Sequence, residues 1–409
     1  HAGGVIFVDE PFTKTTALMR SPKGVIITQL DLHDSEYVSN IKYDVLSIEA
    51  LDKIHICLDL LMEYNYLIPE PTLKETYEKV IGIYNLEREN KEMWEMVWEH
   101  EIMSLFQMEQ QSGIQGIAIL KPTSVDEMAI LNSTIRLMAQ EKGGEMPTQK
   151  LARFKNNPKE WDRELAYYGL GEKEKAILEP IVGISYGLCI AQEQFMQLVQ
   201  LPELGGFSLE FADRLRKSIA KKNPAEFEKV TNEFFTITKE KNCNPKLCKY
   251  VWNVLICMSR GYGFNQSHTL AYSLIGLQEM NLAFHYPLIF WDCACLIADA
   301  GGDENDFEEE EEESEEEENY NNCIEEFGEE ELEEEVEEES NGKTSKKKAK
   351  KTNFGKIAIA IGKMREADVT VTPPDINYST YTFSPDVKNS LIRYGLSGIT
   401  RIGTDLIKK

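Results

Sequence analysis

Five cationic side chains crowd the stretch from Ser208 to Pro224, in a chain whose formal net charge is −26. They are Arg214, Arg216, Lys217, Lys221 and Lys222. Guanidinium and ammonium groups along one surface can hold an anionic ligand. A run of charges on a helix is also a common solvated face, so the pattern alone leaves both interpretations open.

The same stretch predicts a helix that begins at Ser208, a favourable N-cap, and stops before Asn223-Pro224. At about 100° per residue, one face of this helix gathers the apolar side chains Phe211, Ala212, Leu215 and Ile219. The stripe on the opposite face consists of Arg214, Lys217 and Lys221, and Arg216 and Lys222 lie at its flanks. The helical wheel therefore predicts this stripe as the surface that an anion would contact.

A second candidate lies in Ile41–Leu46, which is typical of a strand. Alternation along the strand places Lys42 and Asp44 on the same side. At the end of a strand, Asp44 could hold a divalent metal ion and Lys42 could neutralise a phosphate. A surface ion pair gives the same local pattern, so the two interpretations remain open here.

A third candidate is Gly261–Tyr272, which reads Gly-Tyr-Gly-Phe-Asn-Gln-Ser-His-Thr-Leu-Ala-Tyr. We expect its glycines to end one helix and Ser267 to cap the next. His268 then lies in a first turn, where an anion is favoured. Asn265, Ser267 and His268 would be exposed in a short loop, although helix capping alone also explains these residue types.

The elements that must position these residues are mostly helices. Short β-branched runs at 4–8, 24–28 and 41–46 predict strands, and residues 48–64 predict an amphipathic helix. Further helices are predicted at 72–84, 91–108, 124–140, 172–179, 192–201, 208–220, 225–239, 245–260 and 270–284. The predicted fold class is therefore α+β, with one large helical domain.

The last part of the chain predicts a small α/β segment. A helix is expected at Ile357–Ala367 and a strand at Val369–Val371, and Thr380–Phe383 is expected to pair with Ser390–Tyr394. Gly395–Gly403 has the GhxxhG shape of a hairpin whose backbone amides can hold a phosphate. A plain loop is the alternative.

The charge of the chain is concentrated in one insert. Of the 70 acidic residues, 24 lie between Asp303 and Glu339, so 46 remain against 44 Lys and Arg. The low pI therefore does not exclude a polyanionic substrate. The acidic tract and its Lys-rich tail at Lys343–Lys351 are expected to be a disordered linker, because they bury too little apolar surface.

Composition bounds the class of protein. The length of 409 residues and the hydrophobic content of 42% predict a globular chain of two or three domains. The eight cysteines show no metal-ligand spacing and are expected to be reduced, mostly buried thiols of a cytoplasmic protein. There is no apolar run of membrane-spanning length and no signal peptide, so we expect no membrane partner.

Several segments together resemble, in the same order, the C-family bacterial replicative DNA polymerases. Gly261–His268 is the least ordinary match. The others are His1–Val5, Thr28–Asp31, Ile41–Asp44, Phe106–Glu109, Tyr186–Leu188, Gln192–Met196, Ala212–Lys222, His285–Pro287 and Pro373–Asn377. The resemblance covers nearly all of the chain except the acidic insert.

The resemblance implies an arrangement of domains. Residues 1–60 would be the C-terminal part of a palm with the polymerase-beta-type nucleotidyltransferase fold, and residues 61–302 the helical fingers. Residues 303–352 form the insert, and residues 353–409 would end the fingers and begin a helix-hairpin-helix. The source would be a phage or an atypical bacterium.

The resemblance also implies roles for the candidate residues. Asp44 would be the third of three carboxylates that hold two Mg²⁺ ions, with Lys42 close by. Arg216 and Lys217 would contact the triphosphate of an incoming dNTP, supported by Arg214, Lys221 and Lys222. Asn265, Ser267 and His268 would line the nucleotide site. Expected partners are primer-template DNA, dNTPs and, in a replisome, the sliding clamp and other replication proteins.

The chain departs from the family pattern in places. No segment resembles the palm Asp-x-Asp motif, so we expect it on a missing N-terminal segment or a partner chain; a first residue of His1 fits a processed product, a fragment or a split protein. Arg136-Leu-Met-Ala replaces the usual Arg-Pro-Gly-Pro. Gln266 stands where lysine is usual, and Lys217 replaces a frequent arginine, which loses bidentate phosphate geometry but keeps the charge.

Two functions of different class follow. The first is template-directed nucleotidyl transfer of a dNTP to a primer 3′-hydroxyl, inactive without the other two aspartates. The alternative is a non-catalytic polymerase relic that binds DNA or a replisome partner. A further hypothesis is that the acidic tract covers a DNA-binding groove until primer-template displaces it.

Overall fold

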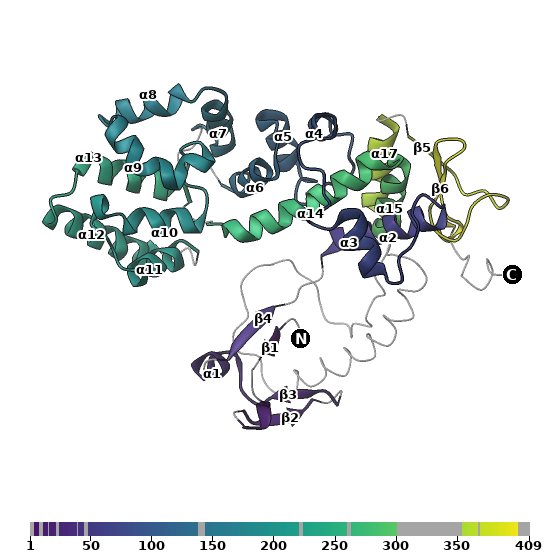
Figure 1. Ribbon diagram of the computed structural model, residues 1–409, viewed down its shortest axis with the longest axis horizontal. Coiled ribbons are helices and arrows are strands. Elements are labelled where there is room, and N and C mark those ends of the chain that lie inside the picture. The colour runs from purple at the N-terminus through teal and green to yellow at the C-terminus, as the bar shows by residue number, and fades with distance from the viewer. Residues whose placement is uncertain are drawn as a thin grey trace, which may run out of the picture. The chain divides into compact units, whose positions relative to one another are not determined.

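The computed structural model describes residues 4–7, 11–14, 16–21, 24–38, 40–44, 48–137, 144–220, 224–259, 263–300, 354–366 and 369–399. The chain divides into two compact units, Cys57–Asp292 and the two flanking parts His1–Ile56 with Cys293–Lys409. Helices dominate and the sheets are small, which confirms the α+β class (Figure 1). The acidic insert and its Lys-rich tail lie outside the described residues.

The N-terminal segment contains two antiparallel strand pairs. β1 (Gly4–Phe7) pairs with β4 (Ile41–Asp44), and β2 (Leu18–Arg20) pairs with β3 (Ile26–Thr28). The short helix α1 (Leu32–Tyr37) precedes β4. The three predicted strands are confirmed; β2, only three residues long, was not predicted.

The helical bounds in and around the unit Cys57–Asp292 are as follows. The helices are α2 (Glu49–Glu63), α3 (Leu73–Ile81), α4 (Lys91–Trp98), α5 (Gln111–Leu120), α6 (Val125–Thr134), α7 (Pro147–Asn156), α8 (Lys159–Tyr167), α9 (Glu172–Val182), α10 (Gln192–Gln200), α11 (Leu209–Ala220), α12 (Pro224–Glu240), α13 (Pro245–Tyr250), α14 (Gln266–His285) and α15 (Leu288–Ala300). Of these, α5, α7, α8 and α15 were not predicted.

Several predicted helices end earlier or change pitch in the structure; those expected at 72–84 and 124–140 end at Ile81 and Thr134. The helix expected at 91–108 ends at Trp98, because His100, Ser104 and Gln107 all have positive φ and turn the chain out of the helix. The helix expected at 245–260 continues from α13 as a π-helix at Val251–Ile256 and a 3₁₀ turn at Cys257–Ser259. A pattern of apolar spacing does not register such changes of helical pitch.

The 20-residue helix α14 organises the helical unit (Figure 1). It packs along α6 and also contacts α3 and α4. Its buried Asn281 accepts a hydrogen bond from Glu87 N (2.9 Å) and donates one to Glu87 O (3.0 Å). Its buried Glu279 accepts one from Phe106 N (2.6 Å). These contacts fix the α3–α4 loop and the irregular segment after α4 onto one helix.

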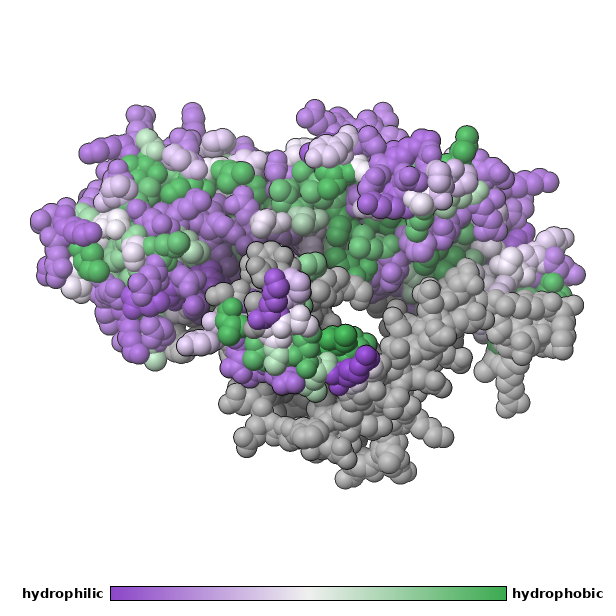
Figure 2. Space-filling view, turned by 60° about the horizontal axis from the view of Figure 1, so that its bottom comes forward, coloured by the Kyte–Doolittle hydropathy of each residue, from purple (hydrophilic) through white to green (hydrophobic). Residues whose placement is uncertain are grey.

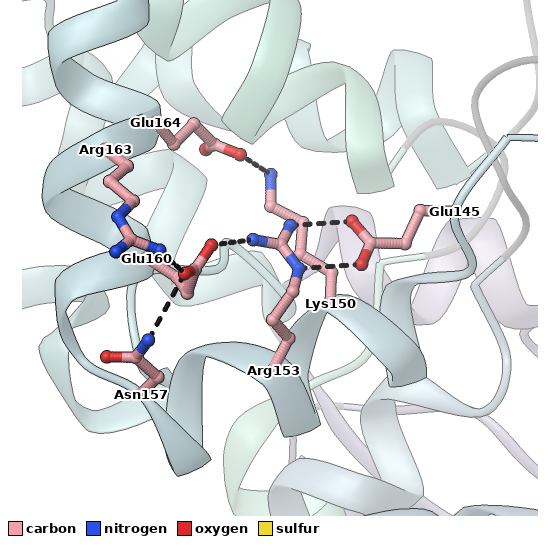
Figure 3. Close-up of polar contacts among 7 residues, drawn as sticks. All are labelled: Glu145, Lys150, Arg153, Asn157, Glu160, Arg163 and Glu164. Carbon is pink, nitrogen blue, oxygen red and sulfur yellow. Dashed lines mark hydrogen bonds and ion pairs between the residues drawn. The ribbon is translucent and has the colours of Figure 1, made fainter.

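Helices α7 and α8 meet in a cluster of polar contacts (Figure 3). Arg153 donates two hydrogen bonds to Glu145 (2.9 and 2.8 Å) and a third to Glu160 (2.9 Å). Hydrogen bonds to the Arg153 guanidinium lower the pKa of the Glu145 carboxyl. Close by, Lys150 pairs with Glu164 (2.6 Å), whose other oxygen accepts the hydroxyl of Tyr250 (2.8 Å). The cluster ties the α7–α8 corner to α13.

The surface of the helical part is mainly polar. Figure 2 shows hydrophilic side chains over most of its visible face, with smaller apolar patches between them. Among the described helices, none combines the length and apolarity needed to cross a membrane. Five of the seven cysteines in the described ranges are buried, as expected.

The C-terminal segment contains α17 (Phe354–Glu366) and a three-stranded sheet. Its strand order is β5 (Thr370–Thr372), β7 (Leu391–Arg393), β6 (Ser384–Asp386); β5 runs parallel to β7 and β6 antiparallel to it. The strand predicted at Thr380–Phe383 was wrong, since the partner of β7 begins at Ser384. Pro385 is tolerated there because β6 is an edge strand. The hairpin predicted at Gly395–Gly403 extends beyond the described residues.

An aromatic core joins α11, α12 and the π-helix. Phe234 of α12 is fully buried and stacks on Trp252, with ring centroids 4.5 Å apart, and on Phe207 at 5.3 Å. Large aromatic side chains contribute most of the burial energy in such a core. This core therefore holds α11 in place.

We expect Phe234→Ala to lower the free energy of unfolding by about 3–5 kcal/mol, because it leaves a cavity between two rings. Phe235→Ala, one position along the same helix and only half-buried, is the control and should cost clearly less. Urea denaturation of both variants measures the difference. Equal losses would contradict this assignment of the core.

Candidate functional site

The helix α11 forms as the sequence predicts. Phe211 N donates to the Ser208 hydroxyl (3.2 Å), which confirms Ser208 as the N-cap. The four apolar residues of the predicted inner face, Phe211, Ala212, Leu215 and Ile219, are all buried. Lys221 and Lys222 lie outside the described residues, so the structure places Arg214, Arg216 and Lys217 of the five cations.

Two of these cations converge on one carboxylate. Asp213 accepts hydrogen bonds from Arg216 Nη2 (2.8 Å) and from Lys217 Nζ (2.9 Å). These hydrogen bonds, from Lys217 first and then Arg216, lower the pKa of the exposed Asp213 carboxyl. The side chain of Lys217 is 59% exposed and that of Arg216 is 33% exposed. Both cations therefore remain within reach of a ligand.

Arg214 faces a different element. Its Nη2 pairs with Glu233 of α12 at 2.6 Å, and its guanidinium lies 5.6 Å from the ring of Phe211. The hydrogen bond that it donates to Glu233 raises the pKa of Arg214. Arg216 and Lys217 are thus brought together, whereas Arg214 is held toward α12.

The N-terminus of α14 is capped by Asn265. Its amide oxygen accepts His268 N (3.0 Å) and the Ser267 hydroxyl (2.5 Å). The prediction that Ser267 caps the helix was wrong, since α14 begins at Gln266, four residues before the predicted Leu270. Asn265, in extended conformation, caps the helix two residues earlier by accepting His268 N. His268 does lie in the first turn, as predicted.

His268 is surrounded by rings and faces a cation. Its ring centroid lies 3.9 Å from that of Tyr272 and 5.1 Å from that of Phe264. The Arg136 guanidinium lies 4.6 Å from the Phe264 ring. Burial, and then the charge of Arg136, lower the pKa of His268 below its usual 6.5. At neutral pH His268 is therefore an uncharged hydrogen-bonding group.

Two residues of this site escaped the assignment of roles from sequence. One is Arg136, which was noted only because its loop departs from the family pattern. It also donates to the side chain of Gln107. The other is Glu193, which accepts a hydrogen bond from Asn265. Both lie in segments far from Gly261–Tyr272 in sequence, so no local pattern could have signalled these contacts.

Helix α10 connects the two groups of candidate residues (Figure 1). It packs against α11. At its first residue, Gln192 N donates to Phe264 O (2.8 Å), next to a parallel bridge between Ala191 and Phe264. A pocket of about 40 Å³ opens between α6, α10 and α14. This volume suits a few water molecules and is too small for a nucleotide.

Lys42 and Asp44 stand two positions apart in β4, opposite Ile6 and Gly4 of β1. Their side chains lie outside the described residues. The described part of the chain holds no cluster of three or more His, Cys, Asp or Glu that could bind a metal ion. A single carboxylate at Asp44 nevertheless suits Mg²⁺, which is commonly bound by one or two carboxylates together with substrate phosphates.

The sequence also matches known families. Residues 70–242 match the model of the bacterial DNA polymerase III alpha subunit finger domain. Residues 368–409 match the model of a helix-hairpin-helix motif. The first match includes α11 with its cations.

The chain is also similar to curated proteins that are named as DNA polymerases. The chain is 38% identical over 407 residues to "Probable DNA polymerase YorL" of Bacillus subtilis (strain 168), covering 100% of this chain and 28% of the relative. The identity and both coverages are the same for "DNA-directed DNA polymerase" of Bacillus phage SPbeta. The present chain is 29% identical over 305 residues to the DNA polymerase III subunit alpha of Escherichia coli (strain K12), covering 74% of this chain and 25% of the relative. The chain thus spans about a quarter of the length of these relatives.

We expect histidine NMR to give His268 a pKa below 6.5. Arg136→Gln should raise this pKa by removing a nearby cation, but not to 6.5, because burial is the larger cause and remains. Since the folded form binds the proton less readily than the unfolded chain, His268 should also reduce stability as pH falls through 6.5. Arg163→Gln, whose guanidinium pairs with Glu160, is the control. An unchanged pKa in Arg136→Gln would refute the coupling.

Proposed function

We propose that this chain, whose residues 70–242 form a finger domain of the DNA polymerase III alpha subunit family, takes part in template-directed DNA synthesis. The reaction would be nucleotidyl transfer from a dNTP to a primer 3′-hydroxyl. The observation that carries the proposal is the pair Arg216 and Lys217 on Asp213, within a finger-domain helix that α10 joins to the α14 N-terminus. Primer-template DNA and dNTPs are the proposed partners.

Each group would have a distinct task at the nucleotide. Arg216 and Lys217 would bind the triphosphate, since both are exposed enough to exchange part of their bonding to Asp213 for phosphate oxygens. Lys221 and Lys222, the next two cations along the chain, would add positive charge. Arg214 would support α11 through its ion pair with Glu233. Ser267 and neutral His268 would offer hydrogen bonds, while Asn265 keeps the turn in shape.

Asp44 would hold Mg²⁺ and Lys42 would neutralise a nearby phosphate. Two bound Mg²⁺ ions would lower the pKa of the primer hydroxyl and stabilise the charge that develops on the α-phosphate. One carboxylate does not hold two metal ions. We therefore propose that two further aspartates, on a longer chain or a partner chain, complete the palm.

A second candidate function has its own support. The helix-hairpin-helix match at 368–409 includes the predicted GhxxhG turn, whose amides can bind a DNA phosphate. Gln266 also lacks the charge of the lysine usual there. A non-catalytic DNA-binding module would use the C-terminal segment and would not need the cations of α11.

Replacing both Arg216 and Lys217 by Ala should weaken metal-dependent dNTP binding by at least about tenfold, because two charge-assisted contacts are lost. Titration of the intact chain with dNTP and Mg²⁺ measures this. Salt-sensitive DNA binding without metal-dependent dNTP binding would favour the DNA-binding module instead.

A separate experiment tests Asp44. Primer extension should require the segment that carries the other two aspartates, and Asp44→Asn should abolish it even when that segment is present. Lys42→Met should leave a reduced rate. Primer extension that survives Asp44→Asn would remove Asp44 from the metal site.

Asp213→Asn should strengthen dNTP binding a few-fold at low salt. It removes a negative charge beside the triphosphate and frees both cations, and the gain should shrink as salt screens the charges. Glu240→Gln, which removes an exposed carboxylate at the end of α12, is the control and should leave dNTP affinity nearly unchanged. A weaker affinity in Asp213→Asn would show that Asp213 orients the cations more than it opposes the ligand.

A further inference from the structure

The carboxylate of Glu193 lies at the N-terminus of α14. One oxygen accepts the Asn265 amide N–H (Nδ2 to Oε1, 2.7 Å), and the other accepts Gln266 N–H (N to Oε2, 3.0 Å). Glu193 belongs to the first turn of α10, and the two residues that it bonds lie more than seventy positions later in the chain. It is therefore a tertiary contact between two helices.

This carboxylate meets the electrostatic demand of the helix end. The first N–H groups of a helix have no intrahelical acceptor, and the end carries about half a positive charge. Glu193 bonds the amide of Gln266, and Asn265 bonds the amide of His268. A phosphate brought to the same amides would face a carboxylate. The anion that this helix end favours is thus supplied by the protein itself.

Glu193 also fixes which way the Asn265 side chain points. An asparagine amide can turn over and exchange its oxygen for its nitrogen. A carboxylate only accepts hydrogen bonds, so it holds the nitrogen of Asn265 toward α10. The oxygen of Asn265 then points at His268 N and the Ser267 hydroxyl. The orientation of two proposed nucleotide contacts follows from this one choice.

The residues on either side of Glu193 are fixed by hydrogen bonds. The neighbouring Gln194 is buried, and its side chain donates to Ser185 Oγ (2.7 Å) and accepts Ile190 N (2.8 Å). On the other side, Gln192 donates through its backbone to Phe264 O and through its side chain to Gly263 O. The first turn of α10 is therefore a fixed support for the start of α14.

We propose that Glu193 is a positioning residue of the nucleotide site. It touches no nucleotide; it orients Asn265, and through Asn265 the side chains of Ser267 and His268, relative to the cations on α11. This inference rests on the proposed function. It identifies Glu193 as the residue that aligns the start of α14 with the cations of α11, since α10 also packs on α11.

The hydrogen-bonding pattern allows a test by exchange. In Glu193→Gln, a single acceptor oxygen must serve two donors, and the new NH₂ group faces a donor. In Asn265→Asp, two carboxylates meet. The double variant Glu193→Gln with Asn265→Asp restores one amide and one carboxylate with the original net charge. The new amide on α10 then donates to the new carboxylate and accepts Gln266 N, and that carboxylate accepts His268 N.

In the intact polymerase, each single variant should raise the KM for dNTP about tenfold, the effect of losing one hydrogen bond to a charged group. The double variant should return the KM to within about threefold of the parent. Glu203→Gln, which removes an exposed carboxylate just after α10, controls for charge alone and should leave the KM unchanged. Thermal unfolding of every variant checks that the fold is intact.

The other outcomes overturn the inference. An unchanged KM in Glu193→Gln would show that the contact positions nothing. A lowered KM would show that Glu193 competes with the nucleotide for the helix end. A loss in the double variant as large as in the singles would exclude the exchange. If the parent polymerase itself binds no dNTP, the proposed function fails; if the parent binds dNTP and the variants match it, only the role of Glu193 fails.

Discussion

The helical unit depends on the need to satisfy polar groups that α14 buries. A buried amide or carboxyl without a hydrogen-bond partner costs on the order of 2–7 kcal/mol by transfer from water, so each of these groups needs a partner. Gln278 donates to Ile81 O (2.8 Å), Asn281 exchanges two hydrogen bonds with the backbone of Glu87, and Glu279 accepts Phe106 N. These side chains pin three separate backbone segments to one helix. The same helix carries the proposed nucleotide contacts at its other end, so the loops and the site share one rigid axis.

The charges of the site are compensated before any ligand arrives. Arg216 and Lys217 share Asp213, Arg214 pairs with Glu233, and the start of α14 is matched by Glu193. Exposed pairs of this kind add little to stability, so their value is in holding side chains in place. A site arranged in this way loses little conformational freedom when an anion replaces a carboxylate partner.

Local patterns in the sequence predicted what depends on local rules. The inner face of α11 followed from the 3.6-residue period, and its start followed from Ser208. The cap of α14 was misassigned because Asn265 and Ser267 are both good cap residues, and only the backbone conformation decides between them. The helix predicted at 91–108 has suitable apolar spacing to its end, yet it stops at Trp98 because Ser104 and Gln107 adopt left-handed conformations. Contacts such as Glu193 with Asn265 join residues distant in sequence, and nothing local encodes them.

The mixture of charged and neutral donors bears on the choice between the two candidate functions, DNA synthesis and DNA binding alone. A surface that grips the DNA backbone gains affinity by releasing counterions in proportion to the number of cations that meet phosphates. In the described part of α11, Arg216 and Lys217 share Asp213 while Arg214, which is also partly exposed, pairs with Glu233, and His268 is neutral near pH 7 because of its burial and Arg136. A pair of cations that shares one carboxylate would suit a small polyanion such as a triphosphate. The proposed ligand of α11 is therefore a nucleotide, and the proposed site of DNA binding lies in other parts of the chain.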